Sequence, residues 1–190
     1  MYALSLPITL ANALTTFRLL MSPVFIAAFF WDNPLSAPLS LAIVLMSEGS
    51  DVLDGHLARS RGQVTAFGKI FDPLADSISR FTVFLCYLAD HLTPLWMVAT
   101  ILYRDMLVST LRTAAASQGV IISARKSGKV KAVVQGASII VIQTLRLAQE
   151  NRDFVATYVY SFMLAVTLVT AWSAVDYVWG NRNVLAKIRK

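Results

Sequence analysis

The stretch DVLDGHLARSRGQVTAFGKIFDPLAD, residues 51–76, places four aspartates in a chain that is otherwise largely apolar. Asp51 and Asp54 are three positions apart, and Asp72 and Asp76 are four positions apart. Either spacing puts both carboxylates of a pair on one face of a helix. A short polar turn, SRGQ, lies between the pairs. The stretch therefore predicts two antiparallel helices on which two acids face two acids.

Four ionised carboxylates at short range need a counter-charge, because their repulsion is prohibitive in low-dielectric surroundings. All-oxygen ligand sets suit hard divalent cations, so the aspartates predict bound Mg²⁺ or Mn²⁺, and four acids can hold two such ions. Gly55 and Gly68 cost helix stability relative to alanine, which we interpret as close approach of a ligand or of backbone. Ala58 has a small side chain that would leave room for such a ligand on the same helix, and Arg59 could bind a phosphate through two hydrogen bonds. The alternative is a set of helix-end carboxylates solvated at a membrane surface.

The whole pattern, D-x2-D-G-x2-A-R-x8-G-x3-D-x3-D, resembles the complete signature of the CDP-alcohol phosphotransferases. The resemblance implies an integral membrane enzyme that transfers a phosphatidyl or similar group from a CDP-linked donor to an alcohol and releases CMP. It also suggests a homodimer. By this resemblance, two metal ions are held by Asp51, Asp54, Asp72 and Asp76, the catalytic base is Asp76, and the donor nucleotide is bound by Gly55, Ala58, Arg59 and Gly68.

The composition predicts a single membrane-embedded domain over residues 1–190. Hydrophobic residues make up 56% of the chain and its mean hydropathy is +0.61, above the values typical of soluble proteins. No basic region precedes the first apolar run, so we expect no cleavable signal and insertion by the first membrane helix. The single cysteine, Cys86, excludes an intrachain disulfide and is interpreted as a small buried hydrophobe.

Apolar segments of about 20 residues or more can cross ~30 Å of hydrocarbon as helices. We therefore predict an all-α integral membrane protein with six transmembrane helices and a polar cavity open to the cytosolic face. The expected helices cover about residues 10–31, 39–59, 65–88 and 94–117, then a segment that follows a basic loop at 123–131 and ends near 148, and finally 154–179.

The distribution of charge predicts how the chain is oriented in the cytoplasmic membrane. Six crossings put both termini on one side, and the loops on that side carry most of the lysines and arginines. The positive-inside rule places this side, with the aspartates, at the cytosol. The net charge of +6 suits anionic lipid headgroups and phosphorylated substrates. Nucleic-acid binding is disfavoured, because the basic residues flank membrane spans.

A second group of charges predicts an acceptor site. Arg104 and Arg112 share a face of the fourth expected helix, and Lys129 and Lys131 follow in the next basic segment. Together these four side chains suit a phosphorylated acceptor. The RD, LR and GK-x-K elements resemble the phosphatidylglycerophosphate synthase branch, whose acceptor is glycerol 3-phosphate. The alternatives are an Arg104–Asp105 pair, which is awkward because helix neighbours point about 100° apart, and ordinary loop charge for the lysines.

Three further polar residues stand out. Arg18, in an NxxTTxR run, resembles first-helix openings of this family that line the active-site cavity, and snorkelling to the interface is its alternative. Glu48 precedes Asp51 by three positions, so it either orients a ligand or bonds a buried neighbour. Ser77 departs from the branch, in which many synthases have lysine after the fourth aspartate; Arg80 follows one turn later.

These features predict transfer of a phosphatidyl group from CDP-diacylglycerol to glycerol 3-phosphate at a two-metal aspartate site. The same chemistry with inositol phosphate, serine or another alcohol is the alternative, although an unphosphorylated acceptor would leave the basic group without a purpose. A divalent-cation transporter is a third hypothesis. It is disfavoured because the acids gather at one face, whereas a transport path needs polar groups through the whole membrane.

Overall fold

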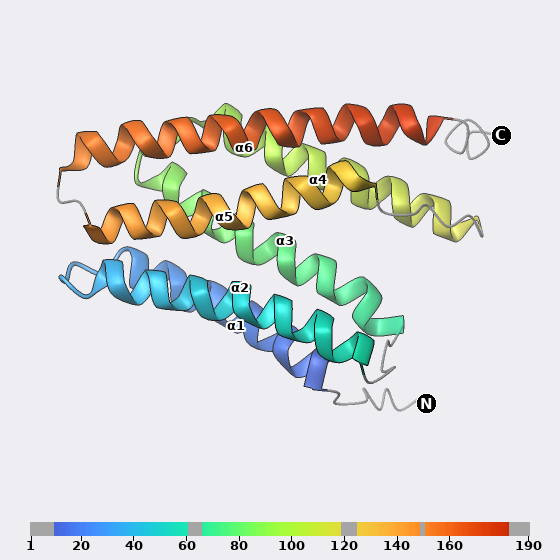
Figure 1. Ribbon diagram of the computed structural model, residues 1–190, viewed down its shortest axis with the longest axis horizontal. Helices are drawn as coiled ribbons and strands as arrows, with labels where there is room; N and C mark the ends of the chain where they lie inside the picture. Colours follow the sequence, from blue (N-terminus) through green and yellow to red (C-terminus); the bar gives the residue numbers. More distant parts are fainter. Residues whose placement is uncertain (1–9, 61–65, 119–124, 149–150, 183–190) are drawn as a thin grey trace. The chain divides into compact units, whose positions relative to one another are not determined.

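Helices make up the part of the chain that the computed structural model describes, namely residues 10–60, 66–118, 125–148 and 151–182 (Figure 1). Of residues 10–12, 51–60 and 66–71 the structure describes the backbone alone. Within these ranges the all-α prediction is confirmed. The six helices described are α1 (Leu10–Phe29), α2 (Ser36–Ser60), α3 (Ala66–Ala89), α4 (Leu95–Ser117), α5 (Lys126–Ala148) and α6 (Arg152–Gly180).

Short polar side chains define the helix ends that face each other across tight turns. Between α1 and α2, the Asn33 side chain accepts a hydrogen bond from the Leu35 amide at 2.9 Å. Ser36, the first residue of α2, donates through its hydroxyl to the carbonyl oxygen of Phe29 at 3.1 Å. Asn151 caps α6 by accepting from the Phe154 amide at 3.1 Å, which satisfies a backbone donor that a helix start otherwise leaves open.

The basic segment before α5 is shorter than the sequence predicts. We expected a loop through Lys131, whereas α5 begins at Lys126 and carries Lys131 in its second turn. Ser127 donates to Asp176 of α6, and Lys131 donates to Asp105 of α4. These contacts hold the start of α5 against the two helices that precede and follow it in the chain. A run of lysines is compatible with either state, so the local pattern does not reveal the contacts.

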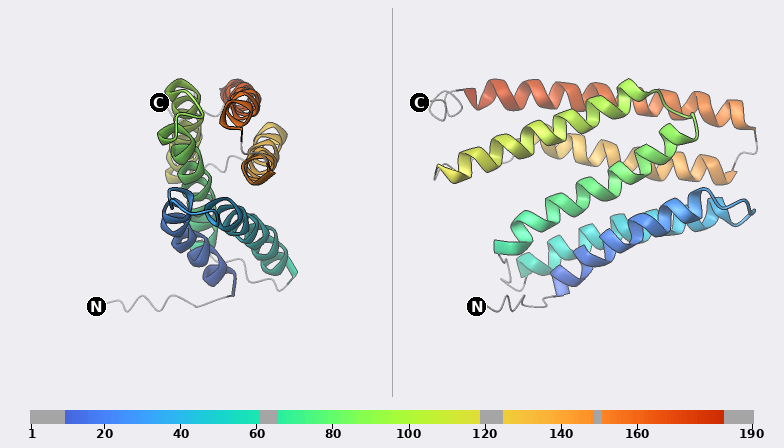
Figure 2. Two further views of the ribbon diagram at one scale, coloured as in Figure 1. Left: turned by 90° about the vertical axis from the view of Figure 1, so that its left-hand side faces the viewer. Right: turned by 180° about the vertical axis from the view of Figure 1, so that it is seen from behind.

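The helices group into two units, and the boundary between them falls inside α3, between Val83 and Phe84. In the first unit α1 and α2 lie side by side, with buried side chains that include Phe25, Ile43 and Val44 (Figures 1 and 2). In the second unit α6 lies beside both α4 and α5. The buried apolar side chains of these three helices include Met97, Ile101, Ile139, Ile142, Val159 and Met163.

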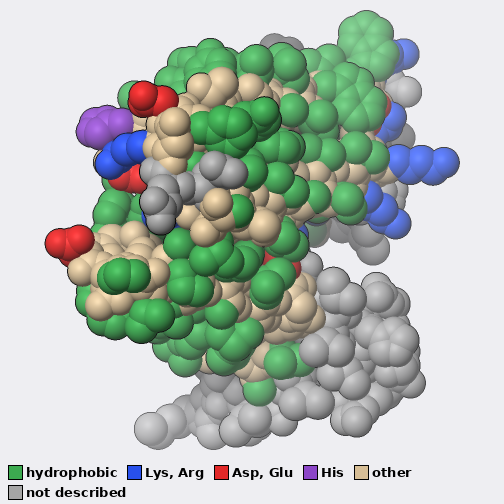
Figure 3. Space-filling view, turned by 60° about the vertical axis from the view of Figure 1, so that its left-hand side comes forward, with side chains coloured by type: hydrophobic (Ala, Val, Ile, Leu, Met, Phe, Trp, Pro, Cys, Tyr) green, Lys and Arg blue, Asp and Glu red, His purple; other side chains and the backbone are tan. Residues whose placement is uncertain are grey.

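The exterior of the helices is apolar. Leu168, Trp172 and Val175 of α6 are 61%, 55% and 67% exposed. Hydrophobic side chains cover the visible sides of the helices, whereas charged side chains gather toward helix ends (Figure 3). Apolar surface of this extent is costly in water and suits lipid. In the described part of the chain α5 and α6 are long and apolar enough to cross a membrane, and 13–29 is a shorter apolar segment. Six crossings and a cavity open to the cytosol stay predictions.

Candidate active site

The signature aspartates fall on two helices of the first unit. Asp51 and Asp54 lie in α2, and Asp72 and Asp76 lie in α3. Helical backbone at these positions agrees with the i,i+3 and i,i+4 spacing of each pair. The side chains of Asp51, Asp54, Gly55, Ala58, Arg59 and Gly68 lie outside the described residues, so their predicted roles stay predictions.

The Asp72 carboxylate accepts a hydrogen bond from a side chain of α1. Thr15, whose side chain is fully buried, donates from its hydroxyl to Asp72 Oδ1 at 2.7 Å. A hydrogen bond of this kind sets the orientation of a carboxylate and directs its second oxygen, as the outer partners of metal ligands commonly do. The oxygen chemistry of Asp72 and Asp76, one turn apart on α3, suits a hard divalent cation.

Asp76 belongs to a group that we term the Arg80 bridge, formed by Glu48, Asp76 and Arg80. Arg80 donates from Nε to Glu48 Oε1 and from Nη2 to Glu48 Oε2, both at 3.1 Å. Its Nη2 also lies 3.3 Å from Asp76 Oδ1. The Arg80 side chain is only 9% exposed, so one largely buried guanidinium contacts two carboxylates. Glu48 therefore bonds a buried neighbour, which was one of its two predicted roles.

Arg18 lies inside the protein. Its residue is 1% exposed on α1, and its carbonyl oxygen accepts a hydrogen bond from the Ser22 hydroxyl at 3.3 Å. A snorkelling arginine extends its guanidinium to the interface and exposes it. The burial of Arg18 disfavours snorkelling, and its predicted place at the active-site cavity stays a prediction.

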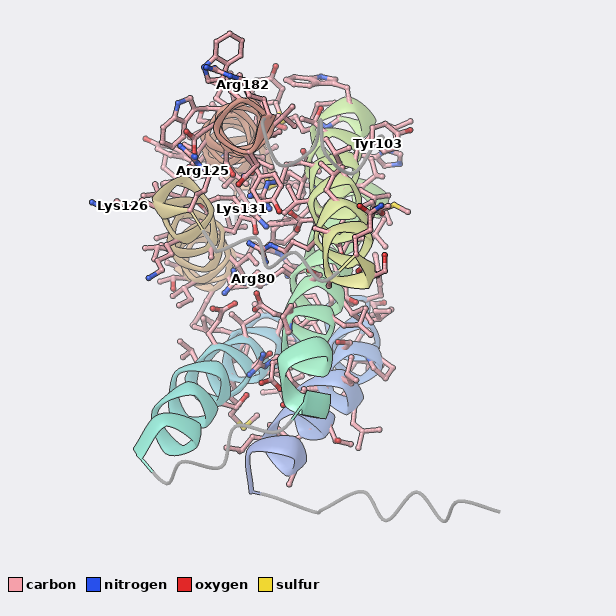
Figure 4. The ribbon with its side chains drawn as sticks, turned by 90° about the vertical axis from the view of Figure 1, so that its right-hand side faces the viewer. Arg80, Tyr103, Arg125, Lys126, Lys131 and Arg182 are labelled. Carbon is pink, nitrogen blue, oxygen red and sulfur yellow. The ribbon has the colours of Figure 1, made fainter. Side chains whose placement is uncertain are left out.

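In the second unit the structure brings together two of the predicted acceptor residues in a group that we term the Asp105 bridge, formed by Arg104, Asp105 and Lys131. Lys131 Nζ donates to both carboxylate oxygens of Asp105 at 2.8 Å. Arg104 donates from Nη1 to Asp105 Oδ1 at 3.0 Å and from Nη2 to the Ser173 hydroxyl at 2.6 Å. Lys131 points between α4, α5 and α6, whereas Lys126 points away from them (Figure 4).

The Arg104–Asp105 contact corrects an expectation from the sequence. Neighbouring positions on a helix point about 100° apart, so a direct pair between them was disfavoured. The pair nevertheless forms, because the long arginine side chain can reach back while its other terminal nitrogen bonds Ser173. Both partners are largely buried, with side chains 10% and 17% exposed.

Arg112 lies against an aromatic ring. Its guanidinium carbon is 5.7 Å from the centroid of Tyr177, a residue of α6 that is 1% exposed. Within the described part of the chain, Nε of Arg104, Nε of Arg112 and the Tyr177 hydroxyl are buried without a hydrogen-bond partner. Buried donors left unpaired are costly, and they are the groups that an anionic ligand would satisfy.

The structure does not bring Lys129 into the Asp105 bridge; its side chain is exposed on the first turn of α5. Conversely, Ser173 and Tyr177 contact the predicted cations and were missed. Their spacing of four on α6 was the available signal, since it puts a hydroxyl and a phenol on one helix face. In an apolar helix that signal is weak, because serine and tyrosine occur at ordinary packing positions.

A third ion pair holds the start of α5 to the end of α6. Arg125 donates from Nε and Nη2 to the two carboxylate oxygens of Asp176, at 2.7 and 2.8 Å. These hydrogen bonds raise the pKa of Arg125. A Cβ atom at Gly180 would overlap the Arg125 guanidinium, so glycine leaves the room that this side chain occupies. The pair places Lys131, six residues after Arg125, next to α4 and α6.

The described helices carry acids on α2 and α3 and buried cations on α4 and α5 that contact α6, and their apolar exterior suits a membrane protein. The family model described as CDP-alcohol phosphatidyltransferase matches residues 8–175, and the chain belongs to this family. The predicted family membership is thereby confirmed. It leaves the cation-transporter hypothesis without support.

Curated relatives carry related names. A Treponema pallidum (strain Nichols) protein named CDP-diacylglycerol–glycerol-3-phosphate 3-phosphatidyltransferase is 36% identical over 125 residues, which cover 64% of this chain and 58% of that protein, less than two thirds of its length. The Blochmanniella floridana protein of the same name is 32% identical over 181 residues, 93% of this chain and 92% of that protein. A probable phosphatidylglycerophosphate synthase of Mycobacterium tuberculosis (strain ATCC 25618 / H37Rv) is 37% identical over 174 residues, 89% and 79% of the two chains.

Proposed function

We propose that the protein transfers the phosphatidyl group of CDP-diacylglycerol to glycerol 3-phosphate and releases CMP, at the cytosolic face of the cytoplasmic membrane. The observation that carries this proposal is the buried excess of cationic donors in the second unit. Arg104 and Lys131 both donate to the carboxylate of Asp105, and among the described residues Arg112 contacts the ring of Tyr177. Buried cations in excess need an anion. The names of the relatives support a phosphorylated acceptor.

The acceptor phosphate is held by the second unit. Arg104 and Arg112 donate their Nε groups, which have no hydrogen-bond partner among the described residues. Lys131 adds an ammonium group that is held in place by its hydrogen bond to Asp105. Lys129, exposed in the first turn of α5, supplies a further positive charge on the same helix.

The donor is held by the first unit, where Asp51, Asp54, Asp72 and Asp76 would hold two Mg²⁺ or Mn²⁺ ions. When bound, the ions offset the charge of the donor diphosphate and stabilise the leaving CMP. Gly55, Ala58, Arg59 and Gly68 line the nucleotide. Thr15 holds Asp72 Oδ1 in place, and Arg80 holds Asp76 Oδ1.

Asp76 takes the proton of the acceptor hydroxyl. The hydroxyl oxygen forms a bond to the β-phosphorus of the donor as the bond to the CMP oxygen breaks, so one phosphodiester replaces one diphosphate linkage. The Arg80 contact keeps the Asp76 carboxylate oriented before the acceptor arrives. The proposal further includes one domain over residues 1–190, six membrane crossings and, by family analogy, a homodimer.

An acceptor screen tests this function. Purified protein in detergent receives CDP-diacylglycerol, Mg²⁺ or Mn²⁺, and one candidate acceptor at a time, and released CMP is measured. We expect release with glycerol 3-phosphate and little with serine. Release with inositol phosphate but not with glycerol 3-phosphate would keep the chemistry and change the acceptor. No CMP release with any alcohol would contradict the proposal.

A further inference from the structure

We infer that Asp105 is a positioning residue of the acceptor site, which directs Lys131 and Arg104 toward the phosphate and lowers the positive charge of the site to a value that a phosphomonoester balances. This inference rests on the proposed function, because it assigns a role within the same site.

The geometry supports a directing role. Lysine is a point charge on a flexible stem, and in this chain both carboxylate oxygens of Asp105 accept from Lys131 Nζ at 2.8 Å. Oδ1 also accepts from Arg104 Nη1 at 3.0 Å, while Arg104 Nη2 is held by Ser173. The guanidinium is therefore held at both terminal nitrogens, and its buried Nε has no partner among the described residues. A side chain fixed in this way presents a donor at little entropic cost when a ligand binds.

The charges support a matching role. Among the described residues that form this group, Arg104, Arg112 and Lys131 carry three positive charges, and Asp105 reduces their sum to two. A phosphomonoester carries a charge of about −1.5 to −2 at neutral pH, because its second pKa is about 6. The group with Asp105 is therefore close to neutral with a phosphomonoester bound. With a neutral alcohol bound, the two positive charges of this largely buried group would stay unbalanced, which is costly.

The inference makes a prediction whose sign opposes simple electrostatics. Removing the negative charge of Asp105 makes the site more positive, so attraction alone would strengthen phosphate binding. If Asp105 directs the two cations, its removal weakens binding instead. An alternative is that Asp105 occupies the place of the acceptor phosphate and competes with it. In that case, removal of Asp105 would lower the KM for the acceptor, whereas a positioning role predicts a higher KM.

The test compares Asp105→Asn, Asp105→Glu and the control Asp153→Asn in the CMP-release assay. Asp153 is exposed in the first turn of α6 and lies outside the proposed site. For Asp105→Asn we expect the KM for glycerol 3-phosphate to rise about tenfold, with kcat and the KM for CDP-diacylglycerol within about twofold. Asp105→Glu keeps the carboxylate and should recover part of the loss. The control should match the wild type.

Ligand-induced thermal stabilisation gives a second readout that does not need turnover. Glycerol 3-phosphate should raise the melting temperature of the wild type and raise that of Asp105→Asn less at the same concentration. If Asp105→Asn does not fold, Asp105→Glu carries the test, with an acceptor KM raised by about threefold or more expected. An unchanged or lowered acceptor KM in an active variant overturns the inference and leaves the proposed function standing. Absence of phosphomonoester-dependent CMP release by the wild type overturns both.

Discussion

The Arg80 bridge and the Asp105 bridge are opposite arrangements of the same parts. In the first unit one arginine contacts two carboxylates, Glu48 and Asp76. In the second unit one carboxylate contacts two cations, Arg104 and Lys131. Each bridge is largely buried, and each joins two consecutive helices, α2 to α3 and α4 to α5.

The difference lies in the charge that each bridge leaves over. Counted over its three residues alone, the Arg80 bridge carries one more negative than positive charge, and Asp72 lies one turn from Asp76. Counted in the same way, the Asp105 bridge carries one more positive than negative charge, and Arg112 lies on the same helix as Arg104. Buried excess charge is costly unless a ligand of the opposite sign balances it. The first unit therefore suits metal cations and the second suits an anion, which is the division of work expected for a metal-bound donor and a phosphorylated acceptor.

The largest effect on activity is expected from a substitution in the Arg80 bridge. Asp76→Asn removes both a metal-binding charge and the proposed base, so CMP release should fall by about a thousandfold at saturating substrates. The exposed residue Asp32 provides a matched control, because Asp32→Asn changes the same group outside the site. A rate for Asp76→Asn near that of the wild type would remove the base role.

The next effect separates the two units. Lys131→Ala removes a cation of the Asp105 bridge and should raise the KM for glycerol 3-phosphate by about thirtyfold, while the KM for CDP-diacylglycerol stays within about twofold. Lys126→Ala removes an exposed lysine near the start of the same helix and should leave both constants unchanged (Figure 4). Steady-state CMP release at varied concentrations of each substrate measures the split. Equal effects on the two KM values would contradict the proposal that Lys131 binds the acceptor and not the donor.

A smaller effect on activity is expected from Thr15, a neutral residue whose hydroxyl donates a hydrogen bond to Asp72. Thr15→Val keeps the shape of the side chain but removes the hydroxyl that donates to Asp72 Oδ1. We expect the Mg²⁺ concentration for half-maximal activity to rise about tenfold, with the maximal rate at high Mg²⁺ largely recovered. Thr113→Val, on an exposed face of α4, is the matched control. An unchanged Mg²⁺ dependence would show that Thr15 does not orient a metal ligand.

The smallest effect concerns stability. Glu48→Gln keeps the size of the side chain but removes the charge that pairs with Arg80, and it should lower the free energy of unfolding by about 1 kcal/mol. The cost is modest because the Glu48 side chain is 22% exposed and water replaces part of the interaction. Thermal unfolding of the variant in detergent measures the change. A stability equal to that of the wild type would show that Arg80 gains nothing from Glu48.

The sequence predicted best where the information is local. The i,i+3 and i,i+4 spacings of the aspartates depend only on helix geometry, and the helices that carry them are present. The start of α5 and the Arg104–Asp105 pair were predicted incorrectly, because both depend on contacts with Asp176 and Ser173 of α6. No pattern near Lys131 reveals which acid it will meet. Long-range pairing of charges is therefore the part of the site that required the structure.

The most direct test of the account compares glycerol 3-phosphate with glycerol as acceptors for the purified wild-type protein. The two molecules share the attacking hydroxyl, and the first carries the anion that the second unit is proposed to bind. CMP release from CDP-diacylglycerol in the presence of Mg²⁺ is the measurement. The account predicts a kcat/KM at least about a hundredfold higher for glycerol 3-phosphate, as expected when a buried charged group loses its partner. Equal values for the two acceptors would contradict it.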